Sequence, residues 1–269
     1  MKGLPVVVAF LRRDWAIARS YRLSYVLDLF SSLTQLTIFF SIGRLFDRAD
    51  ISADGALARG YFSFAVIGLV VQTLVIPAVT SLAYRLQTEQ TTGSFEALLT
   101  TPPAPALLML CSAAYDFIRA AISAVLLLVV AWLLFGLSLD TSPTSILVAV
   151  VAFLGIVVLF AAVGIVVAAV AVVVKRASAF SGLVTEMLTL CMGVYFPLSV
   201  LPGPLRIAAE TLPFSWGIGV LRAALLNDRP QIGRLVMALA VAALLLVVAV
   251  RIFNLAVERA KRSGSLAQY

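Results

Sequence analysis

The sequence contains no histidine and only two cysteines, Cys111 and Cys191. Histidine is the side chain that most often serves as a general base near neutral pH and as a metal ligand. Both cysteines lie inside apolar segments, where a cysteine is usually a small buried hydrophobic residue. We therefore expect no disulfide, no metal site, no catalytic residues and no cofactor bound by this chain.

Charged residues are also scarce. They make up 12% of the chain, whereas soluble domains average about 25%. Hydrophobic residues reach 62%, and the mean hydropathy is +1.08. Several apolar runs attain the roughly 20 residues that a helix needs to cross a bilayer, and they are continuous rather than alternating, which disfavours a β-barrel. The composition predicts an all-α, multi-pass membrane protein.

The positions of the few lysines exclude a P-loop site for ATP hydrolysis. The lysines are Lys2, Lys175 and Lys261, and none of them follows a glycine. A P-loop needs the sequence Gly-Lys-Ser/Thr, with the lysine on the phosphates. The chain therefore does not hydrolyse ATP by that route, and an ATP-driven activity would need a separate polypeptide.

The formal net charge of +7 comes from basic residues that flank the apolar runs instead of forming one patch. This distribution argues against nucleic-acid binding and bears instead on membrane orientation, because cytoplasmic loops are enriched in Lys and Arg. Most of the 20 basic residues fall on the side that holds both termini. We expect both termini to be cytoplasmic, the protein to lie in the cytoplasmic (inner) membrane, and no cleavable signal peptide.

The whole chain, 1–269, reads as one transmembrane domain. Its predicted spans are residues 24–43, 61–84, 106–135, 145–174, 182–201 and 232–253. Residues 4–21 precede them and are predicted to form an interfacial amphipathic helix, with an arginine-bearing side facing the headgroups. Asp14 lies on the apolar side of that helix. Local pairing with a neighbouring arginine is favoured over contact with a partner protein.

A few charged or polar residues fall within the spans. Gln35 is near the middle of the first span, where polar groups usually face protein or water, so this span is expected to line a helix interface or a pathway. Asp28 is expected to reach the membrane surface or to pair with Arg22. Asp116 and Arg119 have i, i+3 spacing in the third span, which predicts a structural ion pair rather than a proton relay.

A proline-broken stretch separates the fifth and sixth spans. It contains Leu201-Pro-Gly-Pro-Leu-Arg206 and Glu210-Thr-Leu-Pro-Phe-Ser-Trp-Gly217. These segments are too interrupted for a span and too apolar for a free loop. We predict two short re-entrant helices within 203–228 on the outer side, the second from Ser215 to Leu226. Such backbone must be covered by protein or face water.

A polar island, Arg85 to Pro103, lies between the second and third spans. Residues 92–102 are predicted to form a short helix, with Thr92 or Gly93 as its N-cap and a proline pair as its stop. Phe95, Leu98 and Leu99 would share its apolar face. We interpret this helix as a docking site for a soluble partner.

The order of these elements resembles the membrane subunit of type-2 ABC export permeases, which include drug, polysaccharide and lipid exporters. The sharpest match is Glu89-Gln-Thr-Thr-Gly-Ser-Phe-Glu-Ala-Leu-Leu-Thr-Thr-Pro102, which is similar to the coupling-helix motif of that family. A second match joins Phe196-Pro-Leu-Ser-Val-Leu-Pro202 with Leu212-Pro213 and Leu221-Arg222, and is similar to the re-entrant outer gate.

The resemblance implies partners and site residues. The partners are two copies of an ABC-type ATPase subunit, which would bind ATP and Mg, and a second copy of the chain or a paralogous permease. The ATPase-binding residues would be Arg85, Glu89, Gly93, Ser94, Phe95, Glu96, Leu98, Leu99 and Thr100. The substrate pathway would be lined by Thr34, Gln35, Glu186, Met187 and Met192. The outer gate would comprise Phe196, Pro197, Pro202, Pro213 and Trp216.

Three other functional classes compete with this one. A secondary transporter needs titratable groups at mid-membrane and broken helices in both halves, but the broken element here falls in one half. An intramembrane enzyme needs a catalytic set, which the sequence does not offer. A non-catalytic membrane assembly protein would also suit a docking helix. The sequence does not distinguish an amphipathic drug, a lipid or a glycan as substrate.

Overall fold

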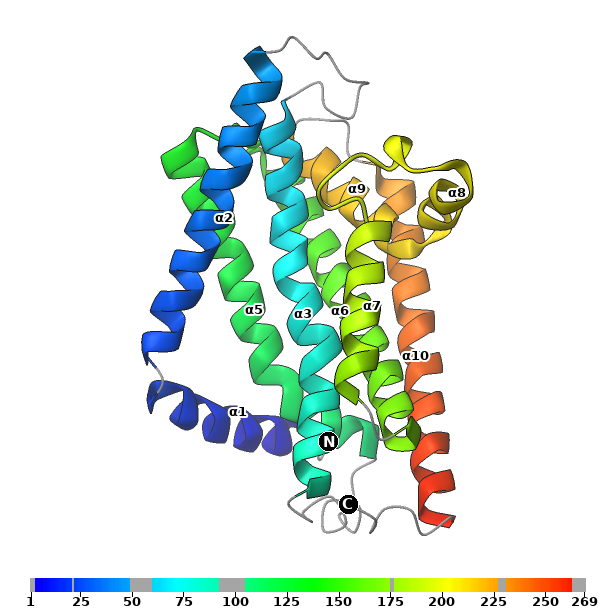
Figure 1. Ribbon diagram of the computed structural model, residues 1–269. Helices are drawn as coiled ribbons and strands as arrows, with labels where there is room; N and C mark the ends of the chain where they lie inside the picture. Colours follow the sequence, from blue (N-terminus) through cyan, green and yellow to red (C-terminus); the bar gives the residue numbers. More distant parts are fainter. Residues whose placement is uncertain are drawn as a thin grey trace.

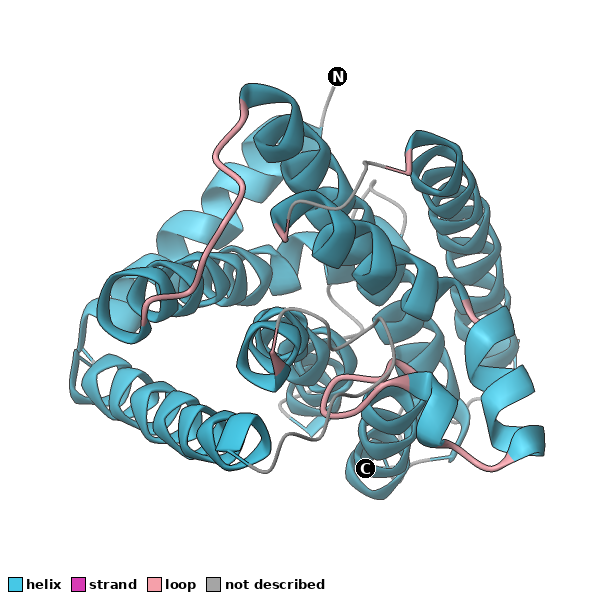
Figure 2. Cartoon of the chain, turned by 90° about the horizontal axis from the view of Figure 1, so that it is seen from above, coloured by secondary structure: helices cyan, strands magenta, loops and turns pink. Residues whose placement is uncertain are grey.

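The computed structural model describes residues 3–20, 22–48, 60–91, 105–174, 177–226 and 231–262. Regular structure in these ranges is helical (Figure 2). The bundle consists of α2 (Arg22–Arg48), α3 (Tyr61–Thr91), α5 (Pro105–Phe135), α6 (Pro143–Val174), α7 (Ala177–Cys191) and α10 (Ile232–Arg262). The amphipathic helix α1 (Gly3–Ser20) lies across one end of this bundle (Figure 1). The prediction of an all-α chain is confirmed for the described residues.

Local sequence explains several helix boundaries. Pro105 and Pro143 are the first residues of α5 and α6, a position where the fixed φ of proline suits a helix and its missing N–H costs nothing. α5 ends at Phe135, and Gly136 follows with a φ of +69°, which glycine adopts without steric penalty. A helix of 31 residues, such as α5, is about 46 Å long and exceeds the roughly 30 Å hydrocarbon core.

Four of these helices are long and apolar enough to cross a membrane. The qualifying segments are Tyr61–Arg85, Ala113–Phe135, Pro143–Ala171 and Ile232–Arg259. α2 is not among them, although it has 27 residues, and it carries charged and polar side chains such as Asp28 and Gln35. α7 is apolar but has only 15 residues.

The structure differs from the predicted fifth span, 182–201. α7 ends at Cys191, and the backbone turns at Gly193, whose φ is +62°. A short 3₁₀ helix, η2 (Leu198–Val200), follows Pro197. The left-handed conformation at Gly193 ends the α-helical path, and Pro197 then lacks the N–H that a continuing helix would need.

Two short helices lie at the end of the bundle opposite α1, α8 (Gly203–Thr211) and α9 (Pro213–Leu225) (Figure 1). α9 begins at Pro213 rather than at the predicted Ser215, because proline is favoured in the first helical turn. α9 packs against α6, α10 and α3. α8 is mostly exposed and buries Ala209.

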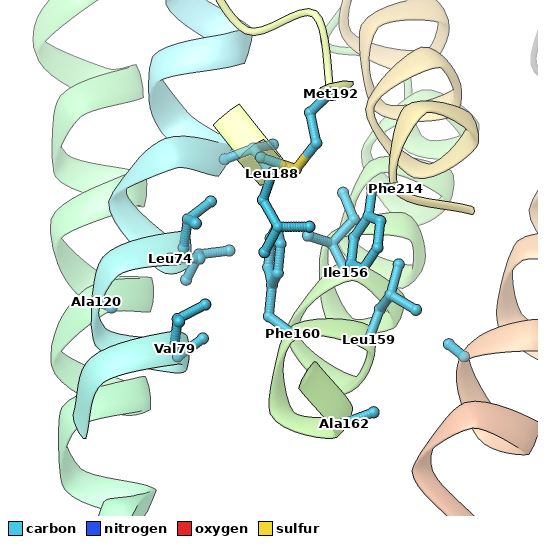
Figure 3. Close-up of a cluster of buried hydrophobic side chains, with 14 of the residues drawn as sticks. Leu74, Val79, Ala120, Ile156, Leu159, Phe160, Ala162, Leu188, Met192 and Phe214 are labelled. Carbon is cyan, nitrogen blue, oxygen red and sulfur yellow. The ribbon is translucent and has the colours of Figure 1, made fainter. Parts of the chain in front are cut away.

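The core is organised around α3. In its apolar segment 72% of the residues are buried, compared with 17–33% in the other three spans. Figure 3 shows side chains of α3, α6 and α7 meeting in this core, including Leu74, Phe160 and Leu188. The ring of Phe160 stacks on Phe214 of α9, with centroids 5.5 Å apart. The core therefore extends to the α8–α9 end.

The outward faces of the bundle are apolar as well. Exposed large side chains include Leu27 and Phe30 on α2, Leu133 and Leu134 on α5, and Leu244 and Val247 on α10. Soluble monomers rarely expose apolar surface on several long elements at once. Lipid, rather than water, is the solvent that suits such an exterior.

Candidate functional site

Charged side chains join three helices at the α1 end of the molecule. Arg85 of α3 forms one ion pair with Asp14 of α1 and another with Asp116 of α5, with nitrogen–oxygen distances of 2.9 Å in both. Arg13 also contacts Asp14 at 2.9 Å. We call these four residues the Arg85 cluster. Asp14 is only 6% exposed, so its charge depends on these partners.

The Arg85 cluster includes residues of the two helices that flank the predicted coupling segment. α3 and α5 are the helices on either side of residues 92–104, which lie outside the described residues. Arg85 and Asp116 therefore tie together the two helices that carry the predicted coupling segment. Asp14 adds α1 to the same unit. A displacement of that segment would act on three helices at once.

The structure revises the pairings expected from sequence. Asp116 and Arg119 were predicted to pair with each other, but the structure gives each a partner on another helix. Arg119 donates through Nη1 to Asp28 of α2 at 2.9 Å. Of the two expectations for Asp28, pairing with Arg22 falls on a side chain outside the described part of the structure. The favoured local pairing of Asp14 with an arginine is present, through Arg13. Its contact with Arg85 was missed, because such partners depend on how helices pack.

A second arginine is buried near the opposite end of the molecule. Arg222 of α9 donates through Nη2 to the backbone carbonyls of Gly193 and Val194, at 2.9 and 3.3 Å, and to that of Phe64 of α3 at 3.2 Å. Its guanidinium carbon also lies 3.5 Å from the centre of the Phe64 ring. Carbonyls beyond the end of a helix lack intrahelical donors, so they suit a cation. Arg222 thereby joins α9, α3 and the turn after α7.

Close backbone approach accompanies this contact. A Cβ atom added to Gly68 of α3 would overlap the carbonyl oxygen of Val194 and would lie 3.0 Å from Nη2 of Arg222. Only glycine leaves room for the turn at this point. The buried cation therefore holds the three elements together, and glycine at residue 68 leaves the space for their close approach.

Aromatic and polar contacts extend this junction to α2. The hydroxyl of Tyr195 donates to Oε1 of Gln72 at 2.8 Å, and Tyr61 donates to the carbonyl of Tyr195 at 2.9 Å. The ring of Phe39 on α2 stacks on Tyr195, with centroids 5.5 Å apart and planes 3° apart. Gln72 lies inside the predicted second span, 61–84, where a polar residue usually faces protein. Its partner, Tyr195, was not predicted.

The predicted coupling residues fall mostly beyond the described structure. Gly93, Ser94, Phe95, Glu96, Leu98, Leu99 and Thr100 lie outside the described residues. Glu89 belongs to α3, and Arg85 belongs to the Arg85 cluster. The structure brings Arg85 together with Asp14 and Asp116, neither of which was predicted to share a site with it.

The predicted pathway residues are divided between the surface and the core. Thr34 of α2 and Glu186 of α7 are exposed, and Gln35 is half-buried. Met187 is 52% exposed, whereas Met192 is 1% exposed and packs beside Leu188 in the core (Figure 3). Met192 is therefore buried in the core, whereas the other four are exposed or half-buried.

The predicted outer-gate residues all fall in the region of η2, α8 and α9. Phe196 and Pro197 are half-buried in the turn before η2, and Pro202 is the exposed N-cap of α8. Pro213 begins α9. Trp216 donates its Nε1 to the carbonyl of Glu210 at 2.7 Å, which fixes α9 against the end of α8.

Long apolar helices, apolar outward faces and two helix junctions define a multi-pass membrane protein. The chain belongs to the ABC-2 type transporter family, whose model matches residues 6–226. The resemblance to the type-2 permease subunit is thereby confirmed, and family membership implies an ABC ATPase subunit as a partner. No curated protein matches the chain.

Proposed function

We propose that the chain is the membrane-spanning permease subunit of an ABC exporter, driven by ATP hydrolysis on a separate subunit. Family membership supports the transport role. The observation that best supports the mechanism is the Arg85 cluster, because it joins α3 and α5 next to the predicted coupling helix at 92–102. The substrate would be an amphipathic drug, a lipid or a glycan that leaves the cytoplasm.

The proposed layout has six spans, formed by α2, α3, α5, α6, α7 and α10. Four of them meet the length and composition expected of a span, and α2 and α7 need support from their neighbours. The 15 residues of α7 cover about 22 Å, less than the hydrocarbon core. The turn after Cys191, η2, α8 and α9 would complete the crossing on that side.

The proposed orientation places α1 and both termini in the cytoplasm and α8 and α9 on the outer side of the cell membrane. The basic residues of α1 and of the last turns of α10 support this choice, because positive charge favours the cytoplasmic side. In this orientation the Arg85 cluster lies at the cytoplasmic boundary. The predicted coupling helix would then face a soluble ATPase.

The proposed mechanism couples two ATPase subunits to two permease copies. Closure of the ATPase pair around ATP and Mg would push the coupling helix, and Arg85 would pass that displacement to α1 and α5. Substrate would pass along a two-fold pathway between α2 and α7 of each copy. The exposure of Thr34, Glu186 and Met187 supports a pathway on this surface.

The test uses the full chain purified together with a candidate ABC ATPase and reconstituted into liposomes. We expect the complex to hydrolyse ATP and to move substrate only when ATP is present on the cytoplasmic side. Phe95→Ala and Glu96→Ala are expected to abolish substrate-stimulated ATP hydrolysis while thermal stability stays unchanged. Full stimulation in both variants would contradict the proposed coupling.

A further inference from the structure

The region of the predicted outer gate contains a hollow, and Trp216 is one of its lining residues. The hollow is an open cavity of about 570 Å³ between η2, α8, α9 and the first turns of α10. Its lining residues are Leu198, Glu210, Ser215, Trp216, Gly219, Arg234 and Met237. The hollow thus combines one carboxylate, one guanidinium and an apolar lining.

The charged groups belong to different helices. Glu210 of α8 forms an ion pair with Arg206 at 2.7 Å, and both side chains are about half exposed, at 47% and 48%. Arg234 projects from the exposed first turn of α10. Arg234 and Glu210 line the hollow, while Arg206 pairs with Glu210, so the hollow offers one donor group to an anion and one acceptor group to a cation. This charge pattern matches a zwitterion with a phosphate.

The apolar part of the hollow is firmly positioned. The indole of Trp216 is held by its hydrogen bond to the carbonyl of Glu210. Met237 lies one turn beyond Arg234 on α10 and is 49% exposed. Tryptophan is enriched at the boundary between hydrocarbon and headgroups, where one end of its ring is wet and the other apolar. The hollow therefore presents charge at its rim and hydrocarbon-compatible side chains beside it.

We infer that this hollow binds a membrane phospholipid with an amine-bearing headgroup, such as phosphatidylethanolamine. The phosphate pairs with Arg234, the ammonium group contacts Glu210, and the first carbons of the lipid lie along Met237 and Trp216. Guanidinium groups recognise phosphate through paired N–H donors, and basic residues near a bilayer surface attract lipid phosphate. The inference rests on the proposed function only in assigning this lipid to the outer leaflet.

The location favours a lipid over the transported substrate. α10 stands at the edge of the bundle away from α2, the helix proposed to line the pathway (Figure 1). Exposed apolar residues continue along α10 below the hollow, including Val236, Leu244 and Val247. A bound acyl chain would follow that face. A free phosphate ion would meet only the exposed charges, which hold an ion weakly.

The experiment measures lipid retained by the purified full chain, using native mass spectrometry after incubation with equal amounts of phosphatidylethanolamine and phosphatidylglycerol. We expect the wild-type chain to retain about two- to fivefold more of the ethanolamine lipid, the size of effect that one exposed charge contact gives. Arg234→Gln should lower the retention of both lipids by a similar factor. Glu210→Gln should remove the preference between them. Arg259→Gln, on the exposed far end of α10, is the matched control and should change nothing.

Three results would each overturn the inference. The first is equal retention of both lipids by the wild-type chain, and the second is unchanged retention in Arg234→Gln. The third is full displacement of the lipid by millimolar inorganic phosphate, which would make the hollow a site for a free anion. The assay needs no ATPase. Absence of lipid selectivity together with intact ATP coupling would therefore refute this inference alone. Lipid selectivity without ATP coupling would refute the proposed function alone.

Discussion

Arg222 bears a buried charge, and in the described part of the chain its Nη2 donates to backbone carbonyls rather than to a carboxylate. Burying a cation is costly unless hydrogen bonds replace its hydration. Here the carbonyls bound by Nη2 and the ring of Phe64 provide part of that replacement, while Nε is buried without a hydrogen-bond partner among the described residues. The residue is therefore structural in the first place, because it holds together the elements around the outer gate.

We predict that Arg222→Leu destabilises the protein, because the carbonyls of Gly193 and Val194 lose their shared donor inside the protein. The expected cost is about 2–5 kcal/mol, the range for breaking a buried charged contact. Thermal unfolding of the detergent-purified chain measures it as a lower Tm. Arg206→Leu is the control, because its ion pair with Glu210 is exposed and should cost less than about 1 kcal/mol. Equal Tm values for the two variants would refute this role.

Arg85 differs from Arg222 because its partners are carboxylates on two other helices. Asp14 and Asp116 would repel each other if Arg85 were removed, and Asp14 is too buried for water to screen it. The three charges therefore form one unit. The effects of changing them should not add.

A mutant cycle over Arg85, Asp14 and Asp116 tests this dependence. Arg85→Gln is expected to lower both Tm and ATP-stimulated transport, whereas Arg85→Gln combined with Asp14→Asn and Asp116→Asn should recover part of the lost stability. A coupling energy of about 1–3 kcal/mol is expected for groups in direct contact. Additive losses would show that the three residues act independently. Recovery of stability without recovery of transport would separate the mechanical role of the charges from their structural one.

At the scale of elements, the junction of α3, α9 and the turn after α7 depends on Gly68. We predict that Gly68→Ala forces these elements apart, because its new methyl group would overlap the carbonyl of Val194. Overpacking of this kind costs about 1–3 kcal/mol. Gly182→Ala is the matched control on α7, since a Cβ atom there meets nothing within 4 Å and alanine favours the helix. A Tm for Gly68→Ala at or above the wild-type value would contradict this packing.

Helix boundaries show how far the sequence could predict the elements. α5 and α6 were predictable because Pro105, Gly136 and Pro143 act through their own backbones. The end of α7 was not, because Gly193 occurs in an apolar run and its left-handed conformation is accompanied by contacts from Arg222 and α3. A local signal therefore fixes the first kind of boundary, and tertiary contact helps to fix the second.

The same limit applies to the candidate sites. Asp14 lies on the apolar face of its helix and Gln72 lies inside a predicted span, so each needs a polar partner in the protein. Their partners, Arg85 and Tyr195, are 71 and 123 residues away in sequence. No spacing rule connects residues across helices. A single sequence shows which residues need a partner, but the packing of the helices identifies that partner.

At the scale of the whole molecule, α2 buries Leu36 against α3 and α5 but packs on the bundle less extensively than α10 does. It contacts α3 and α5 along one side, and its other side exposes large apolar residues together with the polar Thr34. α10 also exposes apolar residues, but it packs extensively against α6 and α9. A helix that mixes polar and apolar groups on its outer face is better suited to contact protein or a water-filled path than lipid alone. This contrast favours α2 over α10 as the surface for a second copy.

The contrast leads to a cross-linking prediction. In a background in which Cys111 and Cys191 are replaced by alanine, Thr34→Cys is expected to form a disulfide-linked dimer on mild oxidation of membranes, because a two-fold axis brings the same residue of two copies together. Val247→Cys, which is 58% exposed on α10, is the control and should remain monomeric. Non-reducing gel electrophoresis measures both. A disulfide needs Cα atoms within about 7 Å, so a random encounter in the membrane gives little product. Cross-linking through Val247→Cys and not through Thr34→Cys would place the second copy against α10, and the pathway would then have to be assigned to the opposite edge of the bundle.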